Sequence, residues 1–316
     1  MIATVTLNPA LDQHITVDGL MVEEANRWVK LRPYAGGKGI DVSRAIHEMD
    51  CLSTAYGFIG GAVGRTLEIL LDEEGVLFSF TPIQKETRTN FIITDTRTSQ
   101  QTRIDAPGPR ITRKELNRFV AKMKNIRPKP DILVAGGSIP PGVPEDIYYE
   151  MVQDAHGFGV KTILDCSGKG LEEGIKARPF LIKPNVHEIE RLLGRKLPDE
   201  KSIIKAAFEL VAEGVEIVVI SRNKEGLIAA SRDQVVKAVP PPVKIKSTVG
   251  AGDCTVAGLA IRLANGDSLT EACRLAAAMG TAAVLTPGTA LCIHRDVNRL
   301  LPRIKVLELP DKYDAR

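Results

Sequence analysis

The segment of the sequence best suited to chemistry is a run of very small residues that ends in an acid, Gly250-Ala251-Gly252-Asp253. Small residues let the backbone approach a ligand closely and point its N–H groups at an anion. A helix is expected over 252–264, and the positive end of its dipole would strengthen that attraction. Asp253 in the first turn could accept a proton from an attacking hydroxyl. The pattern predicts an anion hole for a phosphate in transfer beside a general base; the alternative is an aspartate that only caps a helix.

Other phosphate-binding patterns fail in this sequence. The P-loop pattern needs Ser or Thr after Gly37-Lys38, where Gly39 stands, and the dinucleotide pattern needs a third glycine where Thr255 stands. The protein-kinase catalytic loop needs Asn five residues after Asp296, and that position is Leu301. These three nucleotide-binding classes are excluded.

Composition narrows the class of protein further. The 316 residues are 44% hydrophobic and 26% charged, which excludes intrinsic disorder. Lys and Arg (42) nearly balance Asp and Glu (39), so the net charge of +3 gives no basis for a nucleic-acid surface. The five cysteines form no C-x-x-C pair, and no signal peptide or span of ~20 apolar residues is present. We expect a cytoplasmic protein that binds neither nucleic acid nor membrane.

Strand-like and helix-like segments alternate along the chain. Apolar strands are expected at 2–7, 14–17, 53–58, 132–135, 161–165 and 215–221, and helices at 37–49, 63–74, 113–124, 144–155, 202–212, 252–264 and 269–285. This alternation predicts an α/β fold with a central, mainly parallel sheet, whose ligands bind at the carboxyl ends of the strands. We expect one domain over 1–316, with additional strands inserted at about 14–34 and 89–104. The loops to inspect lie near Asp12, Gly36–Lys38, Ser138, Asp165, 183–188, 221–226 and 250–253.

Two glycine-rich motifs carry a family resemblance. Residues 246–258 (KSTVGAGDCTVAG) resemble the second signature of the ribokinase-like carbohydrate kinases, the PfkB family, and residues 35–45 (AGGKGIDVSRA) resemble the first. The resemblance continues through 6–12, 136–142, 165–168, 183–188 and 288–294, so it covers nearly the whole chain. Within the family, the sequence is similar to the phosphosugar branch, which contains 1-phosphofructokinases, tagatose-6-phosphate kinases and 6-phosphofructokinases. It resembles the minor bacterial 6-phosphofructokinase most. The resemblance implies a ribokinase-like three-layer α/β/α sandwich with a small β-sheet lid.

The reaction that the resemblance implies is transfer of a phosphoryl group from ATP to the 1-hydroxyl of fructose 6-phosphate. Asp253 would be the general base, and the backbone of Gly250, Ala251 and Gly252 would stabilise the charge on the transferring group. Asn185 and Glu188 match the family's Asn-x-x-Glu motif, which organises Mg²⁺ and its waters. A monovalent cation such as K⁺ is left open as a further cofactor.

On the sugar side, the resemblance implies contacts with hydroxyls and with the sugar phosphate. A carboxylate accepts hydrogen bonds from two hydroxyls, and guanidinium groups suit a phosphate. Asp41 departs from the family pattern, which has Asn there, and adds a negative charge near the phosphosugar. The residues implied are Asp12, Gly36, Gly37, Lys38, Asp41 and Ser138 for the sugar, with Arg27, Arg88 and Arg103 around its phosphate.

The nucleotide side shows a second departure. The family's Ser-x-Gly-x-x-Gly turn is Ser221-Arg-Asn-Lys-Glu-Gly226 here, with Asn223 in place of Gly. Asn tolerates the left-handed conformation better than other non-glycine residues, so the turn is expected to persist. The nucleotide contacts implied are Lys183, Asn185, Ser221, Asn223, Gly226, Thr248, Gly250 and Gly252.

Several alternatives stay open at this point. Tagatose-6-phosphate kinases and fructose-1-phosphate kinases share nearly every motif, although Arg27, Arg88 and Arg103 together around one pocket would favour a 6-phosphate over a 1-phosphate. A catalytically silent, sugar-phosphate-binding regulator is a different class, and retention of Asp253 and both glycine loops argues against it. The resemblance also implies a homodimer through the lid strands.

Overall fold

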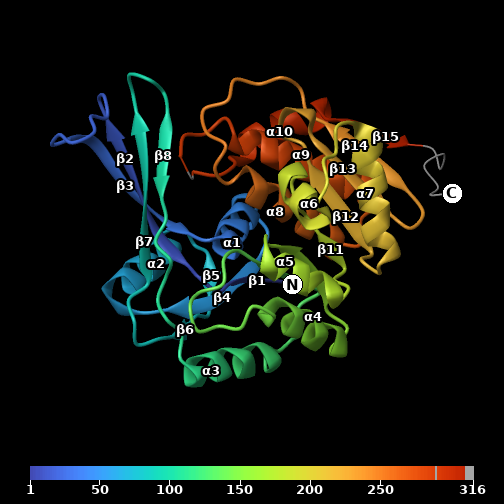
Figure 1. The fold of residues 1–316 in the computed structure, drawn as a ribbon, viewed down its shortest axis with the longest axis horizontal. Helices are drawn as coiled ribbons and strands as arrows, with labels where there is room; N and C mark the ends of the chain where they lie inside the picture. Colours follow the sequence, from blue (N-terminus) through green and yellow to red (C-terminus); the bar gives the residue numbers. More distant parts are fainter. Residues whose placement is uncertain (289, 310–316) are drawn as a thin grey trace.

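Short runs of aliphatic and β-branched residues form the strands of a large sheet. In the computed structural model, which describes residues 1–288 and 290–309, this sheet has eleven strands (Figure 1). From one edge to the other they are β15 (Lys305–Leu309), β14 (Val235–Val239), β13 (Leu227–Ser231), β12 (Ile217–Ser221), β11 (Leu181–Ile182), β10 (Lys161–Asp165), β9 (Ile132–Gly136), β1 (Ile2–Thr6), β4 (Ser53–Ile59) and β5 (Leu77–Phe78), with β6 (Thr81–Pro82) also pairing with β4.

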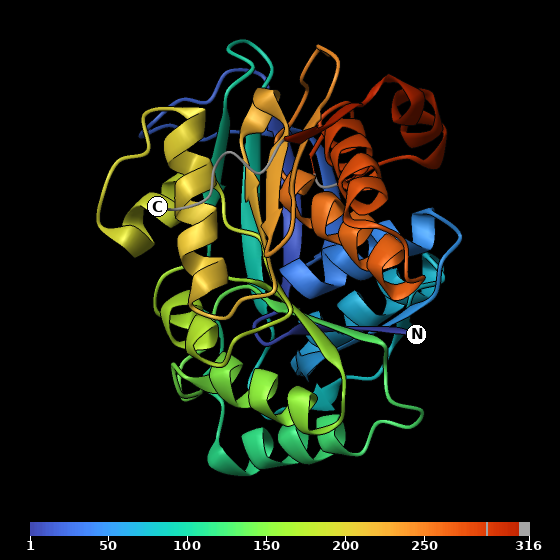
Figure 2. The same ribbon diagram turned by 90° about the vertical axis from the view of Figure 1, so that its right-hand side faces the viewer.

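Helices cover both faces of this sheet, because alternate side chains of each strand point to opposite faces. On β1, Ile2 joins one buried cluster while Ala3 and Val5 join the other. The first cluster is completed by α1 (Lys38–Glu48), α8 (Ala251–Ala264), α9 (Leu269–Ala283) and α10 (His294–Leu300), and the second by α3 (Arg113–Lys124), α4 (Ile147–Gly157), α5 (Lys169–Lys176), α6 (Val186–Leu193) and α7 (Glu200–Ala212). Figure 2 shows the sheet edge-on between these two helical layers.

The second sheet, called the small sheet below, has the strand order β3-β2-β7-β8. Its strands are β2 (Ala10–Val17), β3 (Trp28–Gly36), β7 (Arg88–Asp95) and β8 (Gln101–Ile104), and α2 (Gly61–Glu73) packs against it. Figure 1 shows it projecting from one end of the large sheet. Because β2 begins at Ala10, Asp12 lies within a strand of the small sheet and not, as expected, in a loop after the first strand.

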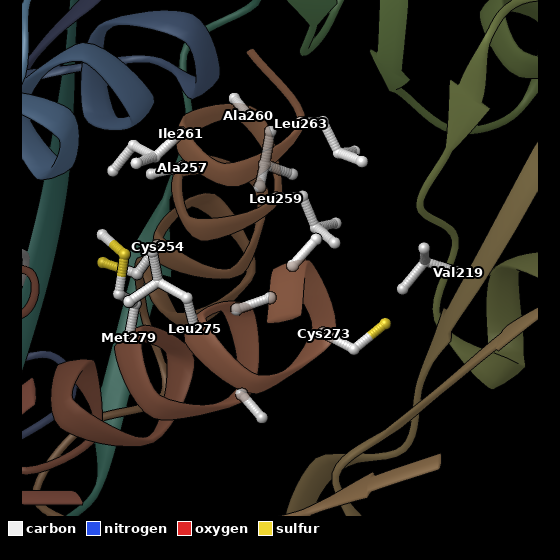
Figure 3. Close-up of a cluster of buried hydrophobic side chains, with 14 of the residues drawn as sticks. Val219, Cys254, Ala257, Leu259, Ala260, Ile261, Leu263, Cys273, Leu275 and Met279 are labelled. Atoms are coloured by element: carbon white, nitrogen blue, oxygen red, sulfur yellow. The ribbon is translucent and has the colours of Figure 1, made fainter. Parts of the chain in front are cut away.

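Helix α8 is held close to α9 along its length. A Cβ atom at Gly258 would lie 2.7 Å from the backbone of Ala276, so the two helices touch backbone to backbone there. Figure 3 shows Cys254, Leu275 and Met279 grouped between these helices. The helix that carries Asp253 is therefore fixed by packing on its inner side.

The α/β architecture with a mainly parallel sheet confirms the prediction from the sequence. The strands β12, β11, β10, β9, β1, β4 and β5 pair in parallel. The strands β13, β14 and β15 pair antiparallel and were not predicted. Helix α4 begins at Ile147 and not at Pro144, because a turn precedes it, closed by a hydrogen bond from Ile147 N–H to the Pro144 carbonyl (3.2 Å). All five cysteines are free thiols. Within the described part of the chain, no helix is both long and apolar enough to cross a membrane.

Candidate active site

Polar side chains gather at the carboxyl ends of the central parallel strands, beside the N-terminus of α8. The last residues of β1, β9 and β10 lie in register, with Gly136 between Thr6 and Asp165. Glycine is required at this point, because a Cβ at Gly136 would lie 2.2 Å from the Asp165 carbonyl oxygen. Ligands of parallel α/β sheets bind at this edge, so the arrangement marks the candidate active site.

The N-terminus of α8 has the geometry of an anion site. Gly250 is its N-cap in the left-handed conformation (φ 79°), and a Cβ there would lie 2.5 Å from the Leu291 side chain. Gly250 has no side chain with which to cap the helix, so the first backbone N–H groups can face a ligand. Asp253 lies in this first turn, and its buried Oδ1 has no hydrogen-bond partner within the described residues.

The charges around Asp253 act in opposite directions. Burial raises the pKa of its carboxyl, the positive charges of Lys38 and Lys183 lower it, and the negative charge of Asp165 raises it, so that the pKa lies above its ordinary value of 3.8. A general base works best when its pKa is near the working pH. The environment therefore moves Asp253 towards that range.

Asp165 holds both lysines and was not assigned a role from the sequence. Its Oδ2 accepts a hydrogen bond from Lys38 Nζ (2.8 Å), and its Oδ1 lies 3.4 Å from Lys183 Nζ. Burial would raise the pKa of Asp165, but Lys183 and Lys38 outweigh burial and lower it, so the carboxylate is ionised. The sequence did indicate the loop after this strand as a place to inspect. The ion pair between Lys38 and Asp165, however, joins residues 127 positions apart, and only the sheet register brings them together.

Asp12 and Gly36, both predicted to contact the sugar, lie together. The Oδ1 atom of Asp12 accepts a hydrogen bond from Asn90 Nδ2 (2.9 Å), its direct partner on β7. A Cβ at Gly36 would lie 2.6 Å from Asp12 Oδ2, so only glycine lets β3 pass this carboxylate. Burial raises the pKa of Asp12, while Asn90 and Arg103 lower it, and the net effect is a raised pKa. Asn90 was not predicted as a site residue.

The charge of Asp41 has a buried partner that the sequence reading missed. Arg44 donates to Asp41 Oδ1 from Nη1 (3.2 Å) and binds Glu74 with Nε (2.6 Å) and Nη2 (2.9 Å). Burial and the charge of Asp253 raise the pKa of Asp41, and Arg44 opposes them. The unusual carboxylate is therefore part of a buried ion network, and it does not simply add an uncompensated charge.

The three arginines expected around the sugar phosphate do not all converge. Arg88 donates to the carbonyl oxygens of Ala106 (2.6 Å) and Asn8 (2.9 Å), and its Nη2 lies 3.5 Å from Ser138 Oγ. Arg103 pairs with Asp105 (2.7 Å), and its charge acts on Asp12.

Arg27 lies apart from the other two arginines. It is exposed and precedes β3, whose other end is Gly36, about 30 Å away at ~3.3 Å per residue. Within one chain Arg27 therefore lies apart from Arg88 and Arg103, so the placement of Arg27 at the sugar phosphate stays a prediction and does not decide between a 6-phosphate and a 1-phosphate.

The turn 221–226, which is predicted to contact the nucleotide, accommodates Asn223 in place of glycine. Asn223 adopts the left-handed conformation (φ 52°), as expected for Asn in place of Gly. Gly226 (φ 82°) does require glycine, since a Cβ would lie 1.9 Å from the Ala238 carbonyl oxygen. Ser221 forms a β-bridge with Asn185, which brings this turn beside Lys183. Thr248 is exposed in the loop just before the α8 N-terminus.

Comparison with known proteins agrees with this arrangement. The model of the pfkB family carbohydrate kinases matches residues 5–296. The chain belongs to this family.

Several relatives of this pfkB kinase are named as phosphofructokinases. The ATP-dependent 6-phosphofructokinase isozyme 2 of Mycobacterium tuberculosis is 38% identical over 299 residues, covering 94% of this chain and 88% of that protein. A 1-phosphofructokinase of Borreliella burgdorferi is 35% identical, covering 98% and 99%. The crystal structure of Escherichia coli phosphofructokinase-2 in complex with fructose-6-phosphate matches with a TM-score of 0.90 at 32% identity, covering 96% and 98%. The chain is thus a sugar kinase of the phosphofructokinase type.

Kinases of this family use ATP with Mg²⁺, and Asn185 and Glu188 are the residues predicted to hold the metal ion. The two residues form the capping box of α6: Asn185 Oδ1 accepts from Glu188 N–H (2.9 Å), and Glu188 Oε2 accepts from Asn185 N–H (2.8 Å). No cluster of three or more acidic, histidine or cysteine ligands exists among the described residues. One carboxylate and one amide fit Mg²⁺, which keeps most of its waters and binds substrate phosphates.

We predict that Asp165→Asn strongly destabilises the kinase, because it leaves two ammonium groups at the site without their shared carboxylate. The expected loss in unfolding free energy is about 3 kcal/mol, measured by urea denaturation at pH 7. Because the folded-state pKa of Asp165 lies below its ordinary value of 3.8, the wild-type advantage is present above that pH and is lost as pH falls further.

Asp154→Asn is the matched control. Asp154 pairs with Lys124 (3.0 Å) at a half-exposed position. Its loss should cost less than about 1 kcal/mol. Equal effects of the two substitutions would contradict the role assigned to Asp165.

Proposed function

We propose that this kinase transfers the γ-phosphoryl group of ATP to the 1-hydroxyl of fructose 6-phosphate, giving fructose 1,6-bisphosphate and ADP. The observation that carries the proposal is the buried, unpartnered Oδ1 of Asp253 in the first turn of a helix capped by a glycine, within the influence of the charges of Lys38 and Lys183. A base and an anion site in contact are the two parts that phosphoryl transfer needs from a protein. The ATP requirement agrees with the cytoplasmic location expected from the sequence.

The proposed mechanism follows from these positions. Asp253 takes the proton of the sugar 1-hydroxyl as its oxygen forms a bond to the γ-phosphorus, and the bond from that phosphorus to the bridging oxygen of ADP breaks. Backbone N–H groups of Gly250, Ala251 and Gly252 and the ammonium of Lys183 stabilise the negative charge on the transferring group. Mg²⁺ held near Asn185 and Glu188 would neutralise charge on the triphosphate when bound. Asp253 then releases its proton to solvent.

The proposed acceptor rests on the sugar side of the site and on the relatives. Asp12, Asp41 and Ser138 offer hydrogen-bond partners for hydroxyls, with Gly36, Gly37 and Lys38 at the end of β3, and Arg88 and Arg103 supply positive charge for a phosphate. The relatives include both 6-phosphofructokinases and 1-phosphofructokinases. Fructose-1-phosphate kinase and tagatose-6-phosphate kinase are therefore the competing activities, and a non-catalytic sugar-phosphate-binding regulator is the competing class.

A substrate panel tests the acceptor. We expect ATP-dependent ADP release with fructose 6-phosphate to exceed that with tagatose 6-phosphate and fructose 1-phosphate in kcat/KM, measured by a coupled assay. Turnover of another phosphosugar with none of fructose 6-phosphate would overturn the assignment while leaving the kinase reaction intact. K⁺ and Na⁺ salts compared in the same assay would test the monovalent cation that accompanies one E. coli phosphofructokinase-2 structure.

Asp253→Asn tests the base. We expect kcat to fall at least ~100-fold, the contribution typical of general-base catalysis, while ATP and the sugar phosphate still bind in calorimetry. Because the pKa of Asp253 is raised, wild-type activity should decline on the acid side at a pH above 3.8, and the variant's residual activity should lack this decline. Unchanged activity would refute the role of Asp253, and binding without turnover in the wild type would favour the regulator.

We further propose that the small sheet serves as the lid of the site and pairs with a second copy of the chain. Phe91 and Ile104 are paired across β7 and β8 and are 41% and 54% exposed, so they form adjoining exposed apolar surface, the kind that marks a protein contact when it extends into a patch. One E. coli phosphofructokinase-2 structure is described as a tetrameric inhibited form, so assembly occurs in a relative.

Phe91→Glu tests the dimer. We expect light scattering to give twice the chain mass for the wild type and the chain mass for this variant, because a charge at the interface would lose its water. Leu52→Glu, at an exposed apolar residue of the loop after α1, is the control and should leave the mass unchanged. A monomeric wild type would contradict the proposal.

A further inference from the structure

The turn between β12 and β13 is closed by its own backbone. Arg222 N–H donates to the Gly226 carbonyl (2.7 Å), Glu225 N–H to the Arg222 carbonyl (3.0 Å), and Gly226 N–H to the Asn223 carbonyl (3.1 Å). Asn223 and Lys224 at its tip are exposed. Asn223 adopts the left-handed conformation, which Asn tolerates better than other non-glycine residues, but a single tolerated residue does not fix the position of the turn against the rest of the fold.

Arg222 supplies contacts that hold the turn from behind. Its side chain is only 9% exposed, although the turn itself lies at the surface. Its Nη1 donates to Glu200 Oε2 (2.7 Å), and its Nη2 donates to Glu225 within the same turn. One guanidinium therefore ties the tip of the turn to the first residue of α7.

A second cation completes the network. Lys237 on β14 also donates to Glu200 Oε2 (2.6 Å), so the carboxylate of Glu200 joins α7, the turn and β14. Figure 1 shows α7 lying against β12, β13 and β14. The two cations and two carboxylates balance, and the fork of Arg222 is directional, so the network fixes orientation as well as charge.

The held turn adjoins the residues assigned to the nucleotide. Ser221 N–H donates to the Pro184 carbonyl (3.1 Å), and Ser221 bridges to Asn185. The turn thus leaves β12 directly beside Lys183 and the start of α6. A displacement of the turn would change the surface available to ATP without touching Asp253 or the sugar side.

We propose that Arg222 is a positioning residue of the nucleotide site, which holds the turn 221–226 in its binding shape before ATP arrives. The proposal rests on the proposed function, because it assumes that ATP binds at this turn. A preorganised turn spares the nucleotide the cost of ordering it. Arg222 supplies this restraint through its bonds to Glu200 and Glu225.

Arg222→Ala tests the proposal. We expect the Kd for MgATP, measured by calorimetry without sugar, and the KM for ATP to rise roughly tenfold, as loss of preorganisation predicts. The KM for fructose 6-phosphate and kcat should stay within about twofold, since uniform nucleotide binding alone is lost. Arg222→Lys keeps the charge but not the fork, and should restore part of the ATP affinity.

Two further variants make the result decisive. Glu225→Gln removes one arm of the network at a residue 56% exposed, so it should fold and raise the Kd for MgATP less than Arg222→Ala. Arg195→Ala is the control, because Arg195 pairs with Glu209 on α7 away from the turn, and should leave it unchanged. A Kd for MgATP that stays within twofold of wild type in both Arg222→Ala and Glu225→Gln overturns the proposal. A wild type that binds no MgATP overturns the proposed function as well, which separates the two failures.

Discussion

The candidate site depends on one buried carboxylate that binds two cations. Asp165 lies between Lys38, at the start of α1, and Lys183, just after β11, and both lysines act on the charge of Asp253. Without this carboxylate, two ammonium groups would repel each other across a poorly solvated space. Because Asp165 ends a central strand, its position is fixed by the sheet register. Its ion pairs in turn hold the flexible side chains of the two lysines in place.

A second buried network, around Asp41, has the same arrangement with the charges reversed. There the central group is a cation, Arg44, and it binds the carboxylates of Asp41 and Glu74 as well as the carbonyl of Ala35. Burying such groups gives little net stability, so their value lies in fixing one arrangement. The two networks flank the α8 N-terminus, and each holds charged side chains in place before a substrate enters.

The sequence predicted those features that depend on local pattern. Alternating apolar segments gave the α/β sandwich, and the glycine motifs gave the helix N-terminus with Asp253 in its first turn. The sequence did not reveal contacts between side chains that are far apart along the chain. Asn90 is 78 positions from Asp12, and Arg44 is 30 positions from Glu74. The sequence also could not place Arg27 in space, because a motif shows that an arginine is present but not at which end of a strand it lies.

Helix α8 touches α9 backbone to backbone at Gly258, five residues beyond Asp253. At a rise of 1.5 Å per residue this contact lies only about 7.5 Å along the axis from the acid. A larger residue at Gly258 would push α8 away from α9 and so displace the turn that carries Asp253. A library of random substitutions scored only by activity would not separate the two positions, while one scored for folding as well would.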